Sequence, residues 1–215
     1  MKRVVFNALA AIAVLALAVA MTSASATADT IDIAISATSP PGTWSFASGG
    51  PLSMATATNA GISFVDLTNG NTYNVAGGGQ LLLTTGNETS AAGCSNCFFA
   101  GNSSTTAITI KSGSTVLFSG EVGISELETT GFTLIANFVG GQFGSSVLTA
   151  LSAAPGVYTG TVSSPIQVTA LNTQGGNGTL GSTDATLASP EPGTLVMFGS
   201  GLLGLAGILR RKLKV

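Results

Sequence analysis

The chain contains no histidine, and this absence removes several kinds of chemistry at once. General acid–base catalysis by imidazole, zinc sites with histidine ligands and haem with a proximal histidine all need that residue. Charged residues are scarce as well, at 7% of 215 residues. The sequence therefore predicts a protein that is not an enzyme and that holds no metal and no cofactor.

Basic residues are nearly missing from the interior of the chain. Of the seven Lys and Arg residues, only Lys111 lies between residues 4 and 209. Nucleic-acid binding depends on basic side chains that contact phosphates, so we expect no nucleic-acid partner. The segment 29–189 holds eight acids against this one lysine, a formal net charge of −7, whereas the whole chain carries −2.

The N-terminus has the pattern of a secretory signal peptide over residues 1–28. Two basic residues at positions 2 and 3 precede an apolar stretch that runs to Met21, and small residues follow. A basic start, an apolar middle and an A-x-A cleavage site define such a signal. Cleavage after Ala26 or Ala28 fits the pattern. We favour Ala28, which starts the mature chain at Asp29, and an uncleaved N-terminal anchor is the alternative.

A second apolar segment lies close to the C-terminus. Gly193–Leu209 are seventeen residues without a charge, and Arg210, Arg211 and Lys212 follow directly. As a helix the segment spans about 26 Å, and flanking basic side chains can make up the difference from a hydrocarbon core of about 30 Å. Basic clusters stay on the cytoplasmic side. We predict a transmembrane helix over 193–209 with a basic stop-transfer cluster over 210–215, and the body on the opposite side of the membrane.

Pro190, Glu191 and Pro192 stand immediately before this segment. The tripeptide, the Gly-rich apolar segment and the terminal basic cluster together resemble the PEP-CTERM sorting signal of Gram-negative bacteria, over residues 190–215 and nowhere else in the chain. The resemblance implies recognition by an exosortase-like enzyme, cleavage near the tripeptide and loss of residues 193–215. It also implies an inner-membrane intermediate, transient or anchored, and delivery to the cell surface or the extracellular matrix, where extracellular polysaccharide would be a partner.

The body, residues 29–171, shows the alternation of half-buried strands. Ile31, Ile33 and Ile35 alternate with polar or small residues, and the segments 62–65, 108–110, 132–138 and 166–170 repeat the pattern. Turn residues separate such segments at intervals of about 8–12 residues. We predict a single all-β domain, a β-sandwich of jelly-roll-like type, with almost no helix.

Three local predictions accompany this fold. Asn69-Gly70, between the strand-like segments 61–68 and 71–76, predicts a hairpin with a two-residue type I′ turn. The segment 80–85 is expected to add a third strand in a meander. Residues 172–189, rich in Gly, Asn and Thr, are expected to form either an edge strand around Thr183–Ala188 or a flexible stalk before the membrane.

Cys94 and Cys97 are the only cysteines. In an exported chain we expect them to form a small disulfide loop, which fixes a local turn more than the whole fold. A redox-active pair would need a helix N-terminus in a thioredoxin-like context. A zinc site would need further Cys or His ligands, and the chain has none to offer. The disulfide is therefore the favoured interpretation.

Glu126 and Glu128 alternate across one residue, so on a strand they share a face, and Glu121 is near in sequence. Such carboxylates could serve a glycosidase or bind Ca²⁺. A solvated strand face is the favoured interpretation, because the chain has no Ca²⁺-loop motif. Trp44 and Tyr73 are candidates for stacking on sugar rings, but for a Trp in a β domain a buried place in the core is the favoured interpretation.

The leading hypothesis is an exported, structural surface protein of a Gram-negative bacterium, associated with exopolysaccharide or biofilm. The alternative is a carbohydrate- or Ca²⁺-binding surface module that uses the two aromatic residues and the three glutamates named above.

Overall fold

The computed structural model describes residues 29–36, 40–91 and 93–189. The predicted signal peptide, 1–28, and the predicted sorting signal, 190–215, with its membrane helix over 193–209, lie outside the described residues. Within the described part, no helix is both long enough and apolar enough to cross a membrane.

The described residues form thirteen strands and one short helix, so the all-β prediction is confirmed. In chain order the elements are β1 (Thr30–Ile35), β2 (Gly42–Ala47), β3 (Pro51–Ala55), β4 (Ile62–Asp66), β5 (Thr72–Asn74), β6 (Gln80–Asn87), β7 (Asn96–Phe99), β8 (Ile108–Ser112), β9 (Thr115–Glu128), β10 (Thr133–Phe143), α2 (Ser145–Leu151), β11 (Tyr158–Asn172), β12 (Gly175–Leu180) and β13 (Thr183–Ala188).

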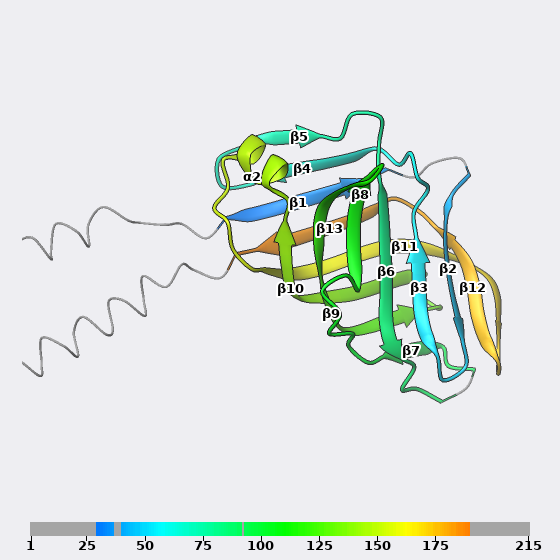
Figure 1. The fold of residues 1–215 in the computed structure, drawn as a ribbon. Helices are drawn as coiled ribbons and strands as arrows, with labels where there is room; N and C mark the ends of the chain where they lie inside the picture. Colours follow the sequence, from blue (N-terminus) through cyan, green and yellow to red (C-terminus); the bar gives the residue numbers. More distant parts are fainter. Residues whose placement is uncertain (1–28, 37–39, 92, 190–215) are drawn as a thin grey trace, which may run out of the picture. The chain divides into compact units, whose positions relative to one another are not determined.

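The strands build two layers that cross at a steep angle (Figure 1). One layer, here the terminal layer, runs in the order β5-β4-β1-β13-β11-β10, with the end of β9 and β7 beyond it. The other, here the opposite layer, runs in the order β12-β2-β3-β6-β8 and continues into the start of β9. Sheets that cross in this way are joined by strands that bend from one into the other.

The long strands β9, β10 and β11 make these connections, and β10 pairs with both of the others. β11 pairs with β13 through Thr159–Ser163 and with β12 through Ile166–Asn172. β9 pairs with β8 near its start and with β7 near its end, and its pairing with β10 shifts register around Phe138. Such bulges increase local bend and twist, which lets one strand serve both layers.

The hydrophobic core lies between the two layers, and alternation along each strand decides which side chains enter it. Ile31 and Ile33 of β1 are 0% exposed, and Ile35 is 2% exposed, as their spacing predicts. Trp44, Leu83 and Ile108 enter the core from the opposite layer and are likewise buried. Helix α2 packs near β4 and β5 and contributes Val147 and Leu151 to the same core.

The region around Asn69-Gly70 does form a hairpin, but the prediction of a two-residue turn is wrong. Asp66 N–H donates to the Asn71 carbonyl, so the loop spans more residues than a type I′ turn has. Gly70 has a φ of +78°, and Asn69 is not among the residues with positive φ. The Asp66 carboxylate accepts the Thr68 N–H at 2.8 Å, and this contact holds the wider loop.

Three further expectations are corrected. β6 is no third strand of a meander, because it pairs with β3 and β8 in the opposite layer after the chain turns at Gly77 and Gly78. Phe132 does not share the core face of Leu134: its φ is +56° in the turn before β10, and its side chain is 58% exposed. Residues 172–189 are neither edge strand nor stalk, because β12 and β13 each have a paired neighbour on both sides.

Candidate functional site

The first and last residues of the described domain are neighbours. β1 and β13 are antiparallel, and Thr30 lies opposite Ala188. Beyond that pair, the Ser189 N–H donates to the Asp29 carbonyl at 2.9 Å. The segment predicted to be a signal peptide and the segment predicted to be a sorting signal therefore join the domain at adjacent backbone positions.

β13 is held on both sides up to its last residue. Ala188 lies opposite Thr30 of β1 and also opposite Thr159 of β11. One residue earlier, Leu187 is 0% exposed and lies opposite Ile31 and Gly160. Only Ser189 separates this strand from Pro190, so the domain ends directly at the tripeptide.

Hydrogen bonds fix the surroundings of this strand pair. The Asp29 carboxylate accepts the Ala154 N–H at 2.7 Å, and the Tyr158 hydroxyl donates to the Ala154 carbonyl at 2.7 Å. Burial of the Tyr158 ring, and then the negative charges of Asp29 and Asp66, raise the pKa of Tyr158 to about 12. The loop before β11 is thus tied to the start of β1.

The β4–β5 hairpin is tied to the same end of the sheet. The Asp66 side chain is 0% exposed and accepts from Asn69 Nδ2 at 2.7 Å. Asn69 and Asn71 each donate through Nδ2 to the Leu151 carbonyl at 2.9 Å, at the end of α2. Leu67 N–H donates to the Thr30 carbonyl. The loops that flank the chain ends are therefore bonded to one another and to the strand pair.

The three candidate glutamates do not converge. Glu126 and Glu128 alternate with buried residues and so share the outer face of β9, as their spacing predicts. Glu126 accepts a hydrogen bond from Asn96 Nδ2 at 3.0 Å, whereas Glu121 lines hollows that include neither of the other two. Among the described residues, the only trio of metal-capable side chains lies elsewhere, so the predicted Ca²⁺ contact finds no shared site.

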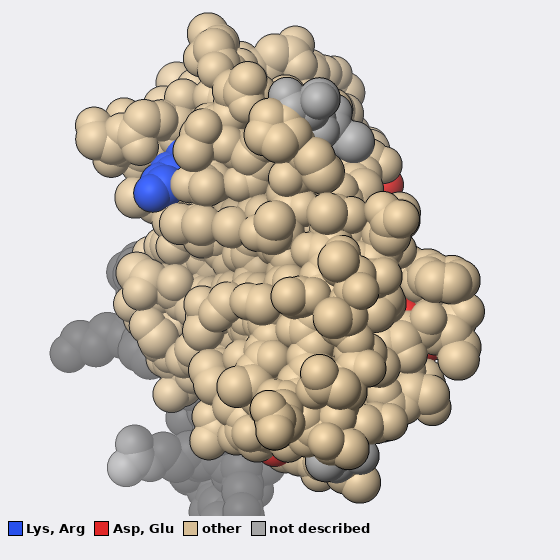
Figure 2. Space-filling view, turned by 90° about the vertical axis from the view of Figure 1, so that its right-hand side faces the viewer, with Lys and Arg blue, Asp and Glu red and all other residues tan. Residues whose placement is uncertain are grey.

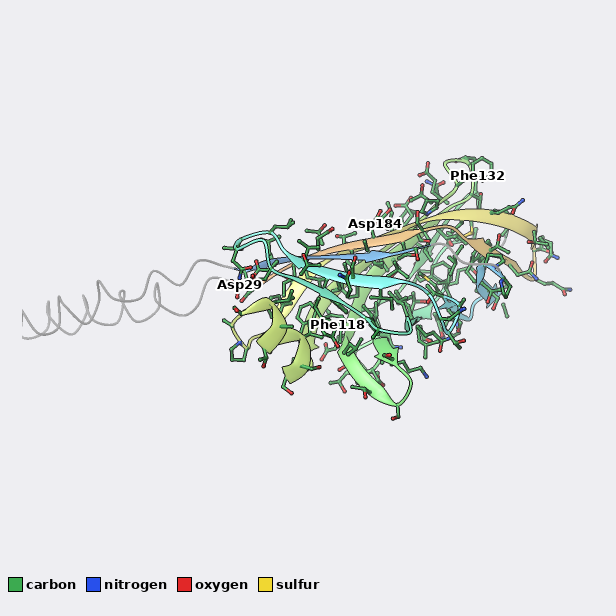
Figure 3. The ribbon with its side chains drawn as sticks, turned by 90° about the horizontal axis from the view of Figure 1, so that it is seen from above. Asp29, Phe118, Phe132 and Asp184 are labelled. Carbon is green, nitrogen blue, oxygen red and sulfur yellow. A yellow bond between two sulfur atoms is a disulfide. The ribbon has the colours of Figure 1, made fainter. Side chains whose placement is uncertain are left out.

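The two candidate aromatic residues are not presented for stacking on a sugar. Trp44 is 1% exposed and packs against Phe46, so the favoured core interpretation is confirmed and the candidate carbohydrate contact is wrong. Tyr73 is partly buried and packs against Phe64. The aromatic side chains that do reach solvent are Phe98, 41% exposed, and Phe132, 58% exposed. In Figure 3 Phe132 stands at the far end of the domain from Asp29.

Cys94 and Cys97 are joined by a disulfide in the loop before and at the start of β7. Cys94 Sγ lies 3.2 Å from Glu88 Oε1, and Ser90 Oγ donates to the same carboxylate at 3.1 Å. This is the trio of metal-capable side chains, but its two sulfur atoms are bonded to each other. The neighbourhood of Glu88 is a contact that spacing in the sequence could not reveal, because the chain turns back between positions 88 and 94.

Charge is distributed unevenly over the domain surface. Asp32, Asp184, Glu126 and Glu128 occupy positions on β1, β13 and β9 that alternate with buried residues of the terminal layer. Lys111 lies on β8 in the opposite layer. Figure 2 shows a face on which almost all side chains are uncharged. No described feature of this surface resembles a basic patch.

Fold and strand geometry together define a class: an all-β domain whose first and last described residues are neighbours and whose last strand is paired up to the residue before Ser189. The tail carries the particular identity. Residues 190–212 match the PEP-CTERM protein-sorting motif, so this chain carries that motif, which indicates an exosortase-targeted extracellular protein. No curated protein matches the chain. No solved structure matches it either.

Proposed function

We propose that this protein is exported, is held at the inner membrane through residues 193–209, and is released to the cell surface or matrix when an exosortase-like enzyme cleaves near Pro190–Pro192. The released β domain has a structural role in a matrix that contains exopolysaccharide. The match of residues 190–212 to the sorting motif is the observation that carries this proposal.

The order of the segments supports the proposed route. A basic and apolar N-terminus precedes the domain, and a second apolar segment with a basic end follows it. The basic end favours the cytoplasm, so the two segments together support a domain on the outer side of the inner membrane. Both segments meet the domain at Asp29 and Ser189, which are hydrogen-bonded neighbours.

The surface of the described domain supports a structural role over catalysis. Asp184 is exposed, and Asp32, Glu126 and Glu128 are half-buried at outer positions of the terminal layer, with no described arginine beside them. Glycosidases need two carboxyl groups about 5–10 Å apart across a cleft. A polar face of Ser, Thr and Asn side chains suits hydration among polysaccharide chains.

Intact-mass measurement of the protein from an exosortase-bearing host tests the route. We expect a mature form that begins at Asp29 and lacks Arg210–Val215, and we expect the precursor to accumulate when the exosortase gene is deleted. A mature form that still contains Arg210–Val215 in the exosortase-bearing host would contradict the proposal and leave a simple membrane anchor.

For the structural role, deletion of this gene should weaken the matrix, and the full chain should restore it.

A further inference from the structure

We propose that the fold itself controls processing of the tail: the enzyme reaches the bond near Pro190–Pro192 only while the end of β13 is detached from β1 and β11. This inference rests on the proposed function, because it concerns how the same sorting signal is presented. Its basis is the position of β13, which is the last strand of the chain and yet an interior strand of the terminal layer.

Distance is the first part of the argument. An extended chain covers about 3.5 Å per residue, so residues 190–192 reach at most about 10 Å beyond Ser189. A domain of about 160 residues has a radius of gyration of about 15 Å. Proteins that bind an extended peptide as an added strand need its main-chain groups free for hydrogen bonds. Here the residues on the N-terminal side of the cleaved bond are Leu187, Ala188 and Ser189, whose backbone partners are already in β1 and β11.

The membrane limits access from the other side. The predicted membrane helix begins at Gly193, so only Pro190, Glu191 and Pro192 lie between the domain and the hydrocarbon. The two prolines lack an N–H group and so cannot extend the β13 ladder. The sequence therefore leaves only Ser189 and the tripeptide between a strand that is paired on both sides and the predicted membrane segment.

Detachment of Ala188 and Ser189 costs little free energy, whereas detachment of Leu187 as well costs much more. Ala188 is exposed and lies at the end of its pairing with Thr30 and Thr159, so release of this end exposes little apolar surface and can occur as a local opening. Leu187 is 0% exposed in the core, and its release would expose apolar surface. The hydrogen bond from Ser189 to Asp29 and the pairing of Ala188 with Thr30 and Thr159 should thus together set how often the bond becomes accessible.

An engineered disulfide between β1 and β13 can prevent the end of β13 from detaching. Asp29 and Ser189 form a hydrogen-bonded pair, so Thr30 and Ala188, one position further, form a pair without hydrogen bonds between them. Side chains in such pairs are close, which suits a disulfide. The double variant Thr30→Cys with Ala188→Cys changes neither the sorting motif nor the core. Each single cysteine variant is its matched control.

The test follows conversion of precursor to mature protein by pulse labelling in the exosortase-bearing host. Peptide mass mapping first confirms that the new disulfide has formed and that Cys94 still pairs with Cys97. We expect the locked chain to convert at least about tenfold more slowly than the wild type and the single variants. Addition of a thiol reductant should remove the difference. An insert of about eight Gly and Ser residues between Ser189 and Pro190 should restore the wild-type rate to the locked chain.

Two outcomes overturn the inference while the proposed function stands. One is a locked chain that converts at the wild-type rate, and the other is a locked chain that stays slow with the insert, which would show that the lock acts elsewhere. The proposed function fails separately if the wild-type precursor is never converted in this host. The variant Glu191→Ala tests the motif alone and should accumulate as precursor with β13 unlocked.

Discussion

Tyr158 shows how single side chains stabilise the end of the domain from which both tails leave. Its ring packs edge-on against Phe143 and its hydroxyl donates to the Ala154 carbonyl. Ala154 in turn donates its N–H to the Asp29 carboxylate. This arrangement requires an un-ionised phenol, because a phenolate would be buried beside two carboxylates.

The pKa of Tyr158 therefore predicts a loss of stability at high pH. In the folded state the pKa is about 12, above the unfolded value of 10. The contribution is complete below pH 10 and declines as pH rises from 10 towards 12, because the unfolded chain loses its proton first. We expect the free-energy difference between the wild type and Tyr158→Phe to shrink across this window in urea titrations. At neutral pH the variant should cost about 1 kcal/mol for the lost hydrogen bond. A difference that stays constant from pH 9 to 12 would contradict this account.

Among the strands, β9 shows why an element can belong to two layers. Its first half pairs with β8 and its second half with β7, and the pairing with β10 shifts register between them. Gly120 lies at this bend, opposite Ile108 on one side and Gly141 on the other. Paired glycines let two backbones approach where side chains would keep them apart.

Substitution of Gly120 tests the close approach of the β9 and β10 backbones. A Cβ at Gly120 would lie 2.6 Å from the Gly140 carbonyl oxygen and 2.7 Å from Gly141 Cα, and both are backbone atoms that cannot rotate away. We expect Gly120→Ala to destabilise the domain by about 2 kcal/mol or more, measured by chemical unfolding. Gly140→Ala is the matched control, because its Cβ would meet only Val157 Cγ1 at 3.8 Å, and it should change stability by less than about 1 kcal/mol. Equal effects of the two substitutions would contradict a backbone collision at the bend.

At the scale of the whole domain, the decisive feature is that the first and last strands are neighbours in the middle of a layer. β1 lies between β13 and β4, and β13 lies between β11 and β1. The terminal layer is therefore complete only when both ends of the body have reached the same compartment. Contacts between residues so far apart in sequence form late and slowly.

Adjacent ends predict that a circularly permuted domain folds. Ser189 and Asp29 can be joined through Asn-Gly, which suits a two-residue hairpin connection, and the chain can be opened after Gly113. Gly113 has a φ of +58°, and nothing lies within 4 Å of the position a Cβ would take, so this turn tolerates new ends. We expect unfolding within about 2 kcal/mol of the linear 29–189 domain. A permutant opened instead between Ala185 and Thr186 should be far less stable, and equal stability of the two would count against the role of β13.

Prediction from the sequence succeeded wherever local alternation decides the outcome. The inward positions of β1 and the shared face of Glu126 and Glu128 follow from a period of two, because successive side chains on a strand point to opposite sides. Prediction failed where residues far away in the sequence decide the local structure. Nothing near Gln80 shows that β6 pairs with β3, and nothing near Phe132 distinguishes a turn with positive φ from one more strand residue.

The sequence by itself determined the all-β class, the acidic body and the sorting tail, because hydrophobic period, charge and motif are properties of neighbouring residues. Only the tertiary structure decided that Trp44 is buried, that Glu88 lies beside the disulfide, and that residues 172–189 are interior strands. Whether a strand is an edge or an interior strand depends on which backbone pairs with it, and for β13 that partner lies at the other end of the chain. This pairing makes the segment expected as an edge strand or a stalk into an interior strand that is held up to the residue before Ser189.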